Sequence, residues 1–229
     1  TGLREVNDWD QPIFNQKELK KRIITSIVLL AIILNCLFIN NYSWLLLLSI
    51  ISFICWFEFI NLIKKIWKKR TLMILLIILS FLVLCLFIHT AYKFRVEEGA
   101  ISILFILGIC IFSDIGGYII GKSIGGTKLT KISPNKTVSG SVGSFLFSLF
   151  PLGILVILDR EANLPGEGIF VCLLLSLACQ LGDLIISYFK RLAKVKDTGK
   201  ILPGHGGMLD RIDGIIFAIP SILILQLLS

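Results

Sequence analysis

The sequence lacks any polar stretch long enough to form a soluble domain, and it contains no internal repeat and no low-complexity segment. Its six cysteines form no C-x-x-C pair and all lie inside apolar runs, which predicts packing residues rather than disulfides or metal ligands. We expect no cleavable signal peptide, because residues 1–22 are polar and no small-residue cleavage site follows the apolar run 23–39. Only 17% of the residues are charged whereas 55% are hydrophobic, and the mean hydropathy is +0.88. Since a soluble domain averages ~45–50% apolar residues, this excess indicates a membrane protein.

Several apolar runs are long enough to cross the hydrocarbon core as helices, which takes roughly 20 residues each. These runs are continuous rather than alternating, and no lipid-exposed backbone group can stay unpaired, so helices are expected in place of a β-barrel. We therefore predict an all-α polytopic membrane protein with about seven transmembrane helices. The predicted spans are 23–39, 42–63, 71–92, 100–120, 142–158, 168–186 and 212–228.

The basic residues divide unevenly between the two ends of these spans. If the N-terminus lies in the cytoplasm, the loops on the outer side hold only three of the 23 Lys and Arg, namely Lys93, Arg95 and Arg160. This bias follows the positive-inside rule and predicts a cytoplasmic N-terminus and an exterior C-terminus, in the inner cell membrane. The two longest polar loops, 121–140 and 190–211, then share the cytoplasmic side, and both are basic and rich in glycine.

The densest polar stretch, 187–213, carries residue types that suit phosphate and metal chemistry. Asp183 and Ser187 come four apart on one predicted helix face, and Asp210 and Asp213 come three apart at the start of the last span. Lys and Arg donate to phosphate oxygens, and glycines let backbone N–H groups approach an anion. Carboxylates so spaced can share a divalent cation, and Mg²⁺ is typically held by one or two carboxylates plus substrate phosphates.

Simpler interpretations of these residues stay open. A basic loop after a span often reflects topology alone, and Pro-Gly and Gly-Gly pairs often only make turns. Asp210 could simply cap the last helix. Asp114 and Asp183 lie inside predicted spans, where an ionisable side chain is costly and indicates function, although a structural ion pair with a neighbouring helix would also explain them.

The same stretch resembles the sequence motif of the phosphatidate cytidylyltransferases, or CDP-diacylglycerol synthases. That motif reads S-x-x-K-R-x4-K-D-x-G-x3-P-G-H-G-G-x2-D-R-x-D, and residues 187–213 match each of its fixed positions. Residues 113–118 (SDIGGY), 131–137 (KISPNKT) and 182–184 (GDL) resemble further elements of the family. Family members often carry an acidic residue just before the motif serine, where this chain has Ile186, and many have one or two more spans.

The resemblance implies an enzyme that transfers CMP from CTP to phosphatidic acid, giving CDP-diacylglycerol and pyrophosphate for phospholipid synthesis. Several negative charges meet in this reaction, so Lys, Arg and metal charge are needed to stabilise them. The expected partners are CTP, phosphatidic acid and membrane lipid, with no nucleic acid, and a homodimer is left open. The chain would divide into a basic interfacial arm, N-terminal transmembrane helices and a catalytic transmembrane part, at residues 1–22, 23–99 and 100–229.

The resemblance also implies a role for individual residues on the cytoplasmic face of the membrane. The expected cofactor is Mg²⁺, with a second cation as an option, and its expected ligands are Asp183, Asp210, Asp213 and, in a secondary role, Asp114. The expected catalytic residues are Asp183, Asp210, Asp213, Lys190, Arg191 and His205. The expected substrate-binding residues are Lys131, Ser133, Asn135, Lys136, Ser187, Lys196, Gly204, Gly206, Gly207 and Arg211. Glu58 is an intramembrane acid whose role stays open.

Other functions compete with this interpretation. A CDP-alcohol phosphotransferase has a D-x-x-D-G-x-x-A-R motif, whose start is echoed at 210–214, but no acidic residue follows Asp213 to supply the second half. An ion-coupled membrane transporter could use Asp114 and Asp183, although no pair of matching broken helices is evident and the polar residues gather at one face. A lipid kinase would need a phosphate-binding G-x-x-x-x-G-K-[ST] run, which the chain lacks.

Overall fold

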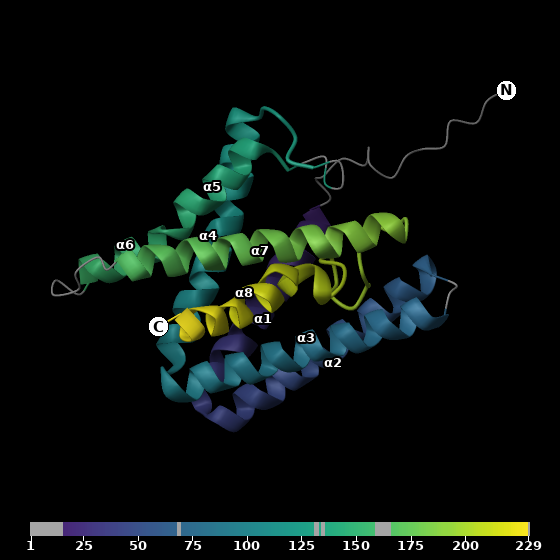
Figure 1. The fold of residues 1–229 in the computed structure, drawn as a ribbon, viewed down its shortest axis with the longest axis horizontal. Helices are drawn as coiled ribbons and strands as arrows, with labels where there is room; N and C mark the ends of the chain where they lie inside the picture. The colour runs from purple at the N-terminus through teal and green to yellow at the C-terminus, as the bar shows by residue number, and fades with distance from the viewer. Residues whose placement is uncertain (1–15, 68–69, 131–132, 134–135, 159–165, 229) are drawn as a thin grey trace.

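The computed structural model describes residues 16–67, 70–130, 133, 136–158 and 166–228, and these ranges are built from helices (Figure 1). Within them no strand forms, and the only β-type pairings are two isolated bridges. The predicted all-α class is therefore confirmed. The helices are α1 (Gln16–Ile39), α2 (Asn41–Ile66), α3 (Arg70–Glu97), α4 (Ala100–Ile124), α5 (Val138–Ser148), α6 (Phe150–Leu158), α7 (Gly166–Leu192) and α8 (Leu209–Leu228).

Six helical segments of the described chain are long and apolar enough to cross a membrane. They are Leu19–Ile39, Asn41–Ile66, Arg70–Glu97, Ala100–Ile124, Val138–Ile157 and Gly166–Leu192. The seventh predicted span corresponds to α8, which is not among these six and which opens with Asp210, Arg211 and Asp213. The polytopic membrane architecture is thus confirmed with six spans by this measure, and the side on which each terminus lies stays a prediction.

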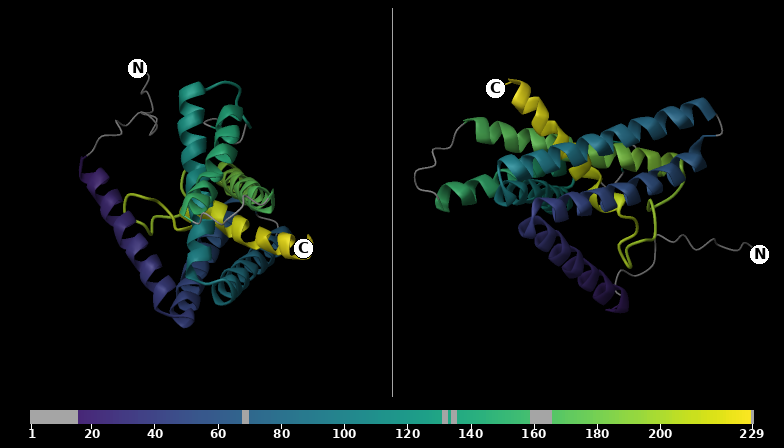
Figure 2. Two further views of the ribbon diagram at one scale, coloured as in Figure 1. Left: turned by 90° about the vertical axis from the view of Figure 1, so that its left-hand side faces the viewer. Right: turned by 90° about the horizontal axis from the view of Figure 1, so that it is seen from below.

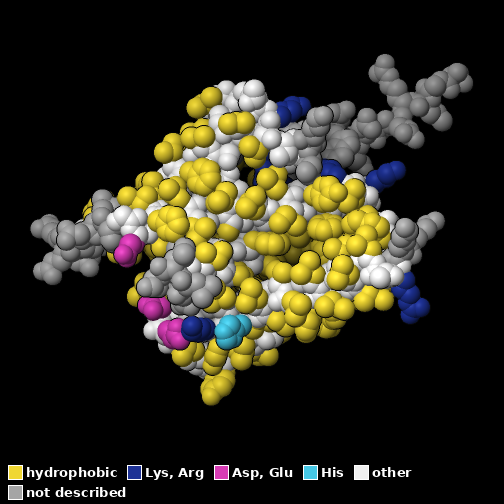
Figure 3. Space-filling view, in the orientation of Figure 1, with side chains coloured by type: hydrophobic (Ala, Val, Ile, Leu, Met, Phe, Trp, Pro, Cys, Tyr) yellow, Lys and Arg dark blue, Asp and Glu magenta, His cyan; other side chains and the backbone are white. Residues whose placement is uncertain are grey.

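The outer surface of the bundle is apolar, as lipid contact requires. Large hydrophobic side chains such as Ile27, Phe53, Leu75 and Ile101 are more than half exposed. Figure 3 shows such side chains covering the middle of one face, with Lys and Arg side chains along its upper and right-hand margins. In water a continuous apolar surface of this size would drive association, whereas in a bilayer it contacts acyl chains.

The predicted span 142–158 is a broken helix rather than a straight one. The break falls at Leu149, between α5 and α6, and Pro151 is the second residue of α6. Proline has no N–H to donate and its ring clashes with the carbonyl four residues before it, so α5 cannot continue through this point. The predicted span is confirmed, since Val138–Ile157 is long and apolar enough to cross a membrane as one span, although its helix is interrupted at Leu149.

The two polar loops are shorter than predicted because the flanking helices extend into them. α4 continues to Ile124 and α5 begins at Val138, with Thr137 accepting a hydrogen bond from the Gly140 N–H at 3.1 Å, so the first loop is 125–137. α7 continues to Leu192 and α8 begins at Leu209, so the second loop is 193–208. The basic residues just before 23 belong to the first turns of α1, and residues 1–15 lie outside the described part of the chain.

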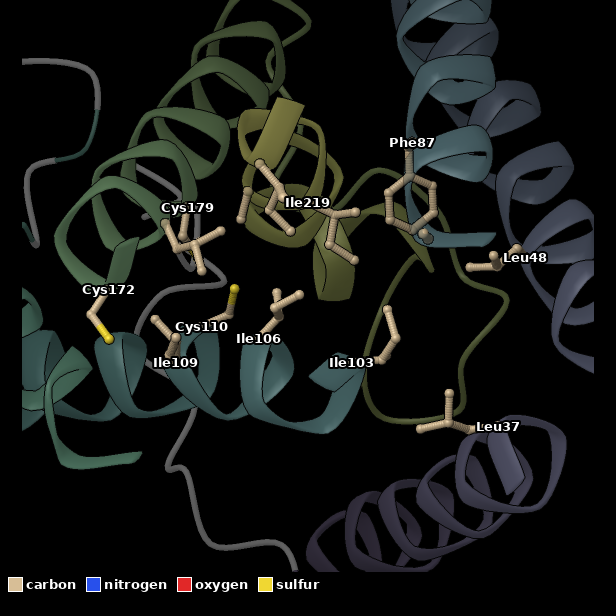
Figure 4. Packing of buried hydrophobic residues seen from close by; sticks show 14 of the residues in the cluster. Leu37, Leu48, Phe87, Ile103, Ile106, Ile109, Cys110, Cys172, Cys179 and Ile219 are labelled. Atoms are coloured by element: carbon tan, nitrogen blue, oxygen red, sulfur yellow. The ribbon is translucent and has the colours of Figure 1, made fainter. Parts of the chain in front are cut away.

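The core of the bundle is packed around α4. Figure 4 shows Ile106, Ile109 and Cys110 pointing from α4 toward Cys179 and Ile219. All six cysteines are free thiols, and Cys55, Cys110, Cys172 and Cys179 are buried among apolar side chains as predicted, whereas Cys36 is half-buried and Cys85 is exposed. α1 packs least against the other helices. It leans away from them in both views of Figure 2, and only 6% of its most apolar stretch is buried.

Glycines bring α7 and α8 into backbone contact beside the polar loops. A methyl group on Gly182 of α7 would lie 2.6 Å from the backbone oxygen of Asp213 and 2.7 Å from the Phe217 ring. A methyl group on Gly214 of α8 would overlap Cys179. Small residues at such crossings let transmembrane helices approach closely. This contact places Asp183, which follows Gly182, beside Asp213, which precedes Gly214.

We expect Gly182→Ala to destabilise the protein, because overpacking a tight contact typically costs about 1–3 kcal/mol. The measurement is thermal unfolding of the purified protein in detergent. The matched control is Gly153→Ala in α6, where an added methyl group meets nothing within 4 Å. A transition temperature for Gly182→Ala as high as that of the control would contradict the close contact.

Candidate active site

A cavity of about 470 Å³ lies at the meeting point of α4, α5, α7, α8 and the 125–137 loop. Four carboxylates and three cationic side chains share its wall, an unusual density of charge for the end of an apolar bundle. The predicted site residues that line it are Asp114, Ser133, Lys136, Asp183, Lys190, Asp210, Arg211 and Asp213. Gly117, Tyr118 and Thr137, which belong to the elements 113–118 and 131–137, also line it, and further lining residues that the sequence did not single out are Leu129, Gly140, Ser141, Ser144, Cys179, Gln180 and Gly214.

Asp183 sits between two partners on the cavity wall. Its Oδ2 forms an ion pair with Lys136 from the 125–137 loop, and its Oδ1 accepts a hydrogen bond of 3.1 Å from the Ser187 hydroxyl. Ser187 itself is buried behind the carboxylate and does not line the cavity. Lys136 therefore joins the 125–137 loop to the α7 aspartate.

Asp213 and Asp114 complete the acidic part of the wall. Asp213 accepts a hydrogen bond of 2.9 Å from the Gly214 N–H, and the charges of Asp183 and Asp114 act on it. Asp114 reaches the cavity from α4, where it lies 3.9 Å from the Cys179 thiol. Like charges this near one another repel, so the neighbouring lysines are needed to hold the group together.

Asp210 has a different environment from the other three aspartates. Its Oδ1 pairs with Lys190 Nζ at 2.8 Å, and the two side chains are only 5% and 13% exposed. Its Oδ2 accepts from the Thr198 N–H at 2.7 Å, the Thr198 hydroxyl at 2.9 Å and the Gly207 N–H at 3.1 Å. Asp210 therefore holds the 193–208 loop together. It accepts N–H groups from that loop, which differs from the simple helix cap that the sequence left open.

The Pro-Gly-His-Gly-Gly segment forms a tight turn whose backbone bonds to itself. Gly204 and Gly206 adopt φ of 77° and 85°, a conformation that glycine permits at little cost. The Leu202 N–H donates to the Gly206 oxygen at 2.9 Å, and the Gly206 N–H donates back at 3.2 Å. With the Gly207 N–H on Asp210, these amides already have protein acceptors, and Gly204, Gly206 and Gly207 do not line the cavity. Their part in binding substrate stays a prediction.

His205 also faces away from the cavity. Its Nε2 lies 3.2 Å from the Ser26 hydroxyl of α1, and its backbone oxygen accepts from Arg211 Nε at 3.1 Å and Nη2 at 2.5 Å. Burial lowers the pKa of the imidazole below its usual range, and the charge of Arg211 lowers it further. The contact between His205 and Ser26 links the 193–208 loop to α1.

The remaining predicted residues either lie away from the cavity or fall outside the described residues. Arg191 in the last turn of α7 and Lys196 in the loop after it are exposed and do not line the cavity. Lys131 and Asn135 lie outside the described residues. Glu58, whose role the sequence left open, is buried behind the 193–208 loop, in contact with Thr198 and the start of α8.

The acidic wall fits a divalent cation only in part. In the described ranges no three His, Cys, Asp or Glu side chains stand close enough together to hold a metal ion on their own. Mg²⁺, however, usually takes one or two carboxylates and completes its shell with substrate phosphates and water. Asp183 and Asp213, neighbours on one cavity wall, could supply that donor set, with Asp183 holding two protein partners, whereas the oxygens of Asp210 are occupied by four protein donors.

We expect Asp210→Asn to unfold at a markedly lower temperature, because removing one partner of a buried pair typically costs about 3–5 kcal/mol. Thermal unfolding in detergent measures the shift. The matched control is Glu97→Gln, which breaks the exposed Lys93–Glu97 pair and should change little. Equal shifts for the two variants would show that Asp210 does not organise the loop.

Known proteins are similar in sequence to the part of this chain that carries the motif. Residues 65–228 match the model of the cytidylyltransferase family. Over 138 residues the chain is 46% identical to a protein of Staphylococcus aureus (strain COL) named phosphatidate cytidylyltransferase, covering 58% of this chain and 52% of that protein. It is 44% identical over 135 residues to the protein of that name from Staphylococcus saprophyticus, covering 57% and 52%. The chain thus spans about half the length of the curated relatives it matches. On the family match, which takes in most of its length, the chain belongs to the cytidylyltransferase family.

Proposed function

We propose that this chain transfers CMP from CTP to phosphatidic acid, releasing pyrophosphate and leaving CDP-diacylglycerol in the membrane for phospholipid synthesis. The observation that carries the proposal is the single cavity in which Lys136, Lys190 and Arg211 face Asp183 and Asp213 at the end of apolar helices. The relatives named phosphatidate cytidylyltransferase support the same reaction. A cavity that is both strongly charged and embedded among membrane helices suits one water-soluble and one lipid substrate.

The reaction needs charge neutralisation more than proton transfer. An oxygen of the lipid phosphate forms a new bond to the α-phosphorus of CTP, while the bond from that phosphorus to the bridging oxygen of the β-phosphate breaks. A phosphate monoester has its second pKa at about 6, so the attacking oxygen is already ionised at neutral pH and no strong base is required. We assign Lys136, Lys190 and Arg211 to the triphosphate and the lipid phosphate, where fixed positive charge lowers the barrier.

Asp183 and Asp213 are the proposed holders of Mg²⁺, with Asp114 as a further acidic neighbour. The bound cation would neutralise phosphate oxygens on the transferred group and on the leaving pyrophosphate. Asp183 pairs with Lys136, and Asp210 pairs with Lys190. A phosphate entering the cavity offers Lys136 a new anionic partner, which would free the Asp183 oxygen for the cation.

We place this site at the cytoplasmic face of the cell membrane. Residues of the 125–137 loop and the first turn of α8, which follows the 193–208 loop, line the same cavity, and His205 of the second loop contacts Ser26 of α1. The Lys and Arg of these segments would then lie inside, in keeping with the positive-inside rule. CTP is water-soluble and would enter from that side, whereas phosphatidic acid would approach along the membrane.

The purified full chain, given labelled CTP, phosphatidic acid and Mg²⁺, should form a liponucleotide and pyrophosphate in equal amounts. We expect Asp213→Asn to lower kcat by about 10²–10³-fold, because it removes the charge that holds the cation near the developing negative charge. The matched control is Glu167→Gln, an exposed acid in the first turn of α7. Near-normal turnover by Asp213→Asn would remove this residue from the site.

We expect Lys136→Ala to act mainly on binding, raising KM for CTP or phosphatidic acid by about tenfold, since it removes one charge-assisted contact. The control is Lys128→Ala in the same loop, whose side chain is exposed and does not line the cavity. Steady-state kinetics with each substrate varied in turn gives the comparison. An unchanged KM for both substrates together with normal kcat would take the 125–137 loop out of the site.

A further inference from the structure

Glu58 is a buried acid in the middle of an apolar helix. It lies on α2, is only 3% exposed, and has Cys55, Phe59 and Leu62 as buried neighbours along that helix. An ionisable side chain at membrane depth is costly unless polar groups surround it, and such residues usually serve function. Residue 58 also precedes the range 65–228, so the family match assigns it nothing.

The polar partners of Glu58 come from the other end of the sequence. The Met208 N–H donates to Glu58 Oε1 at 3.1 Å, and the Leu209 N–H donates to Oε2 at 2.9 Å. These amides stand at the start of α8, where the first N–H groups of a helix have no partner within it. Met208, directly before the helix, is not a capping residue. Glu58 therefore caps α8 from α2, and the helix dipole favours its negative charge there.

Two motif glycines make room for this carboxylate. A methyl group on Gly199 would overlap Glu58 Oε1, and one on Gly207 would lie 2.6 Å from Oε2. Neither glycine has a positive φ, in contrast to Gly204 and Gly206. The backbone conformation at 199 and 207 therefore does not require glycine. Glycine is required there because a larger residue would occupy the space of the Glu58 side chain.

A short chain of hydrogen bonds joins Glu58 to the cavity. The Thr198 hydroxyl lies 3.1 Å from Glu58 Oε2 and 2.9 Å from Asp210 Oδ2, and it donates its one proton to one of them at a time, while the Thr198 N–H donates to Asp210 Oδ2 at 2.7 Å. Asp210 in turn pairs with Lys190, which lines the cavity. Glu58 itself does not line the cavity, so any effect it has on the reaction must pass through these residues and through the start of α8, which carries Asp213 one turn further on.

We propose that Glu58 is a positioning residue of the active site: by capping α8 and holding Thr198, it fixes where Asp210, Lys190 and Asp213 stand. This inference rests on the proposed function for its kinetic consequences, although the anchoring itself does not. Displacing a catalytic group by about 1 Å through a distant substitution can cost up to ~10²-fold in rate. The N-terminal half of the chain would then contribute to the site without touching substrate.

The test compares Glu58→Ala, Glu58→Gln and Gly199→Ala as full-length proteins, each assayed on its monodisperse, folded fraction. We expect Glu58→Ala to lower kcat by about 10–100-fold, with KM for CTP changing far less because Lys136 on the opposite loop keeps its place. Glu58→Gln keeps the shape but turns an NH₂ group toward N–H donors, so a smaller loss is expected. Gly199→Ala should resemble Glu58→Ala, and combining the two should add little, because the methyl group then occupies the vacated space.

Hydrogen exchange supplies a readout that does not depend on activity. In Glu58→Ala the amides of Met208 and Leu209 should exchange about tenfold faster than in the unsubstituted protein, since their acceptor is gone. Ser52→Ala is the matched control, because Ser52 is a buried polar residue of the same helix, 4% exposed, and should leave both kcat and exchange unchanged.

Unchanged kcat, unchanged exchange, or fully additive effects of Glu58→Ala and Gly199→Ala would each overturn the proposal. If the unsubstituted protein makes no liponucleotide, the proposed function fails, whereas faster exchange in Glu58→Ala would still establish the anchor.

Discussion

The backbone contact between α7 and α8 is the constraint on which the site depends. Two glycines, Gly182 and Gly214, remove the side chains that would hold these helices apart, and the residues beside them are Asp183 and Asp213. Carboxylates set side by side in a partly dehydrated cavity repel each other. Lys136 of the 125–137 loop and Lys190 in the last turn of α7 offset that repulsion. The close helix crossing therefore brings the two aspartates together, and the nearby lysines offset the repulsion between them.

The residues of the long motif have two distinct jobs. Lys190, Arg211 and Asp213 face the cavity, where a phosphate or a cation can reach them. Asp210 and the glycines of the Pro-Gly-His-Gly-Gly turn instead satisfy one another's hydrogen bonds and give the 193–208 loop a fixed shape. Buried polar networks of this kind rigidify a segment when each member is satisfied. A substitution in the motif can thus abolish activity either by removing a contact with substrate or by loosening the loop that carries such contacts.

Sequence reasoning reached the membrane-helical class and most of the charged cavity wall, because apolar run length and charge placement are local signals. It missed the break at Leu149, where Pro151 was read as part of one span. It could not foresee that four donors occupy Asp210, or that Glu58 contacts Thr198, 140 positions away. Such bonds depend on how helices cross, which no local pattern encodes. Two signals were present in the sequence: an acidic residue inside an apolar helix, and glycines at positions where no turn requires them. Their relation becomes clear only when the structure brings them together.

We propose that Asp183 and Asp213 together form one cation site beside Lys136 and Lys190. Binding of Mn²⁺, a paramagnetic substitute for Mg²⁺, can be followed by electron paramagnetic resonance in the presence of CTP without relying on turnover. We expect Asp183→Asn to bind Mn²⁺ at least about tenfold more weakly than the unsubstituted protein. Glu167→Gln, at the other end of α7, should bind it normally. Equal Mn²⁺ affinity for Asp183→Asn and the unsubstituted protein would contradict this proposal.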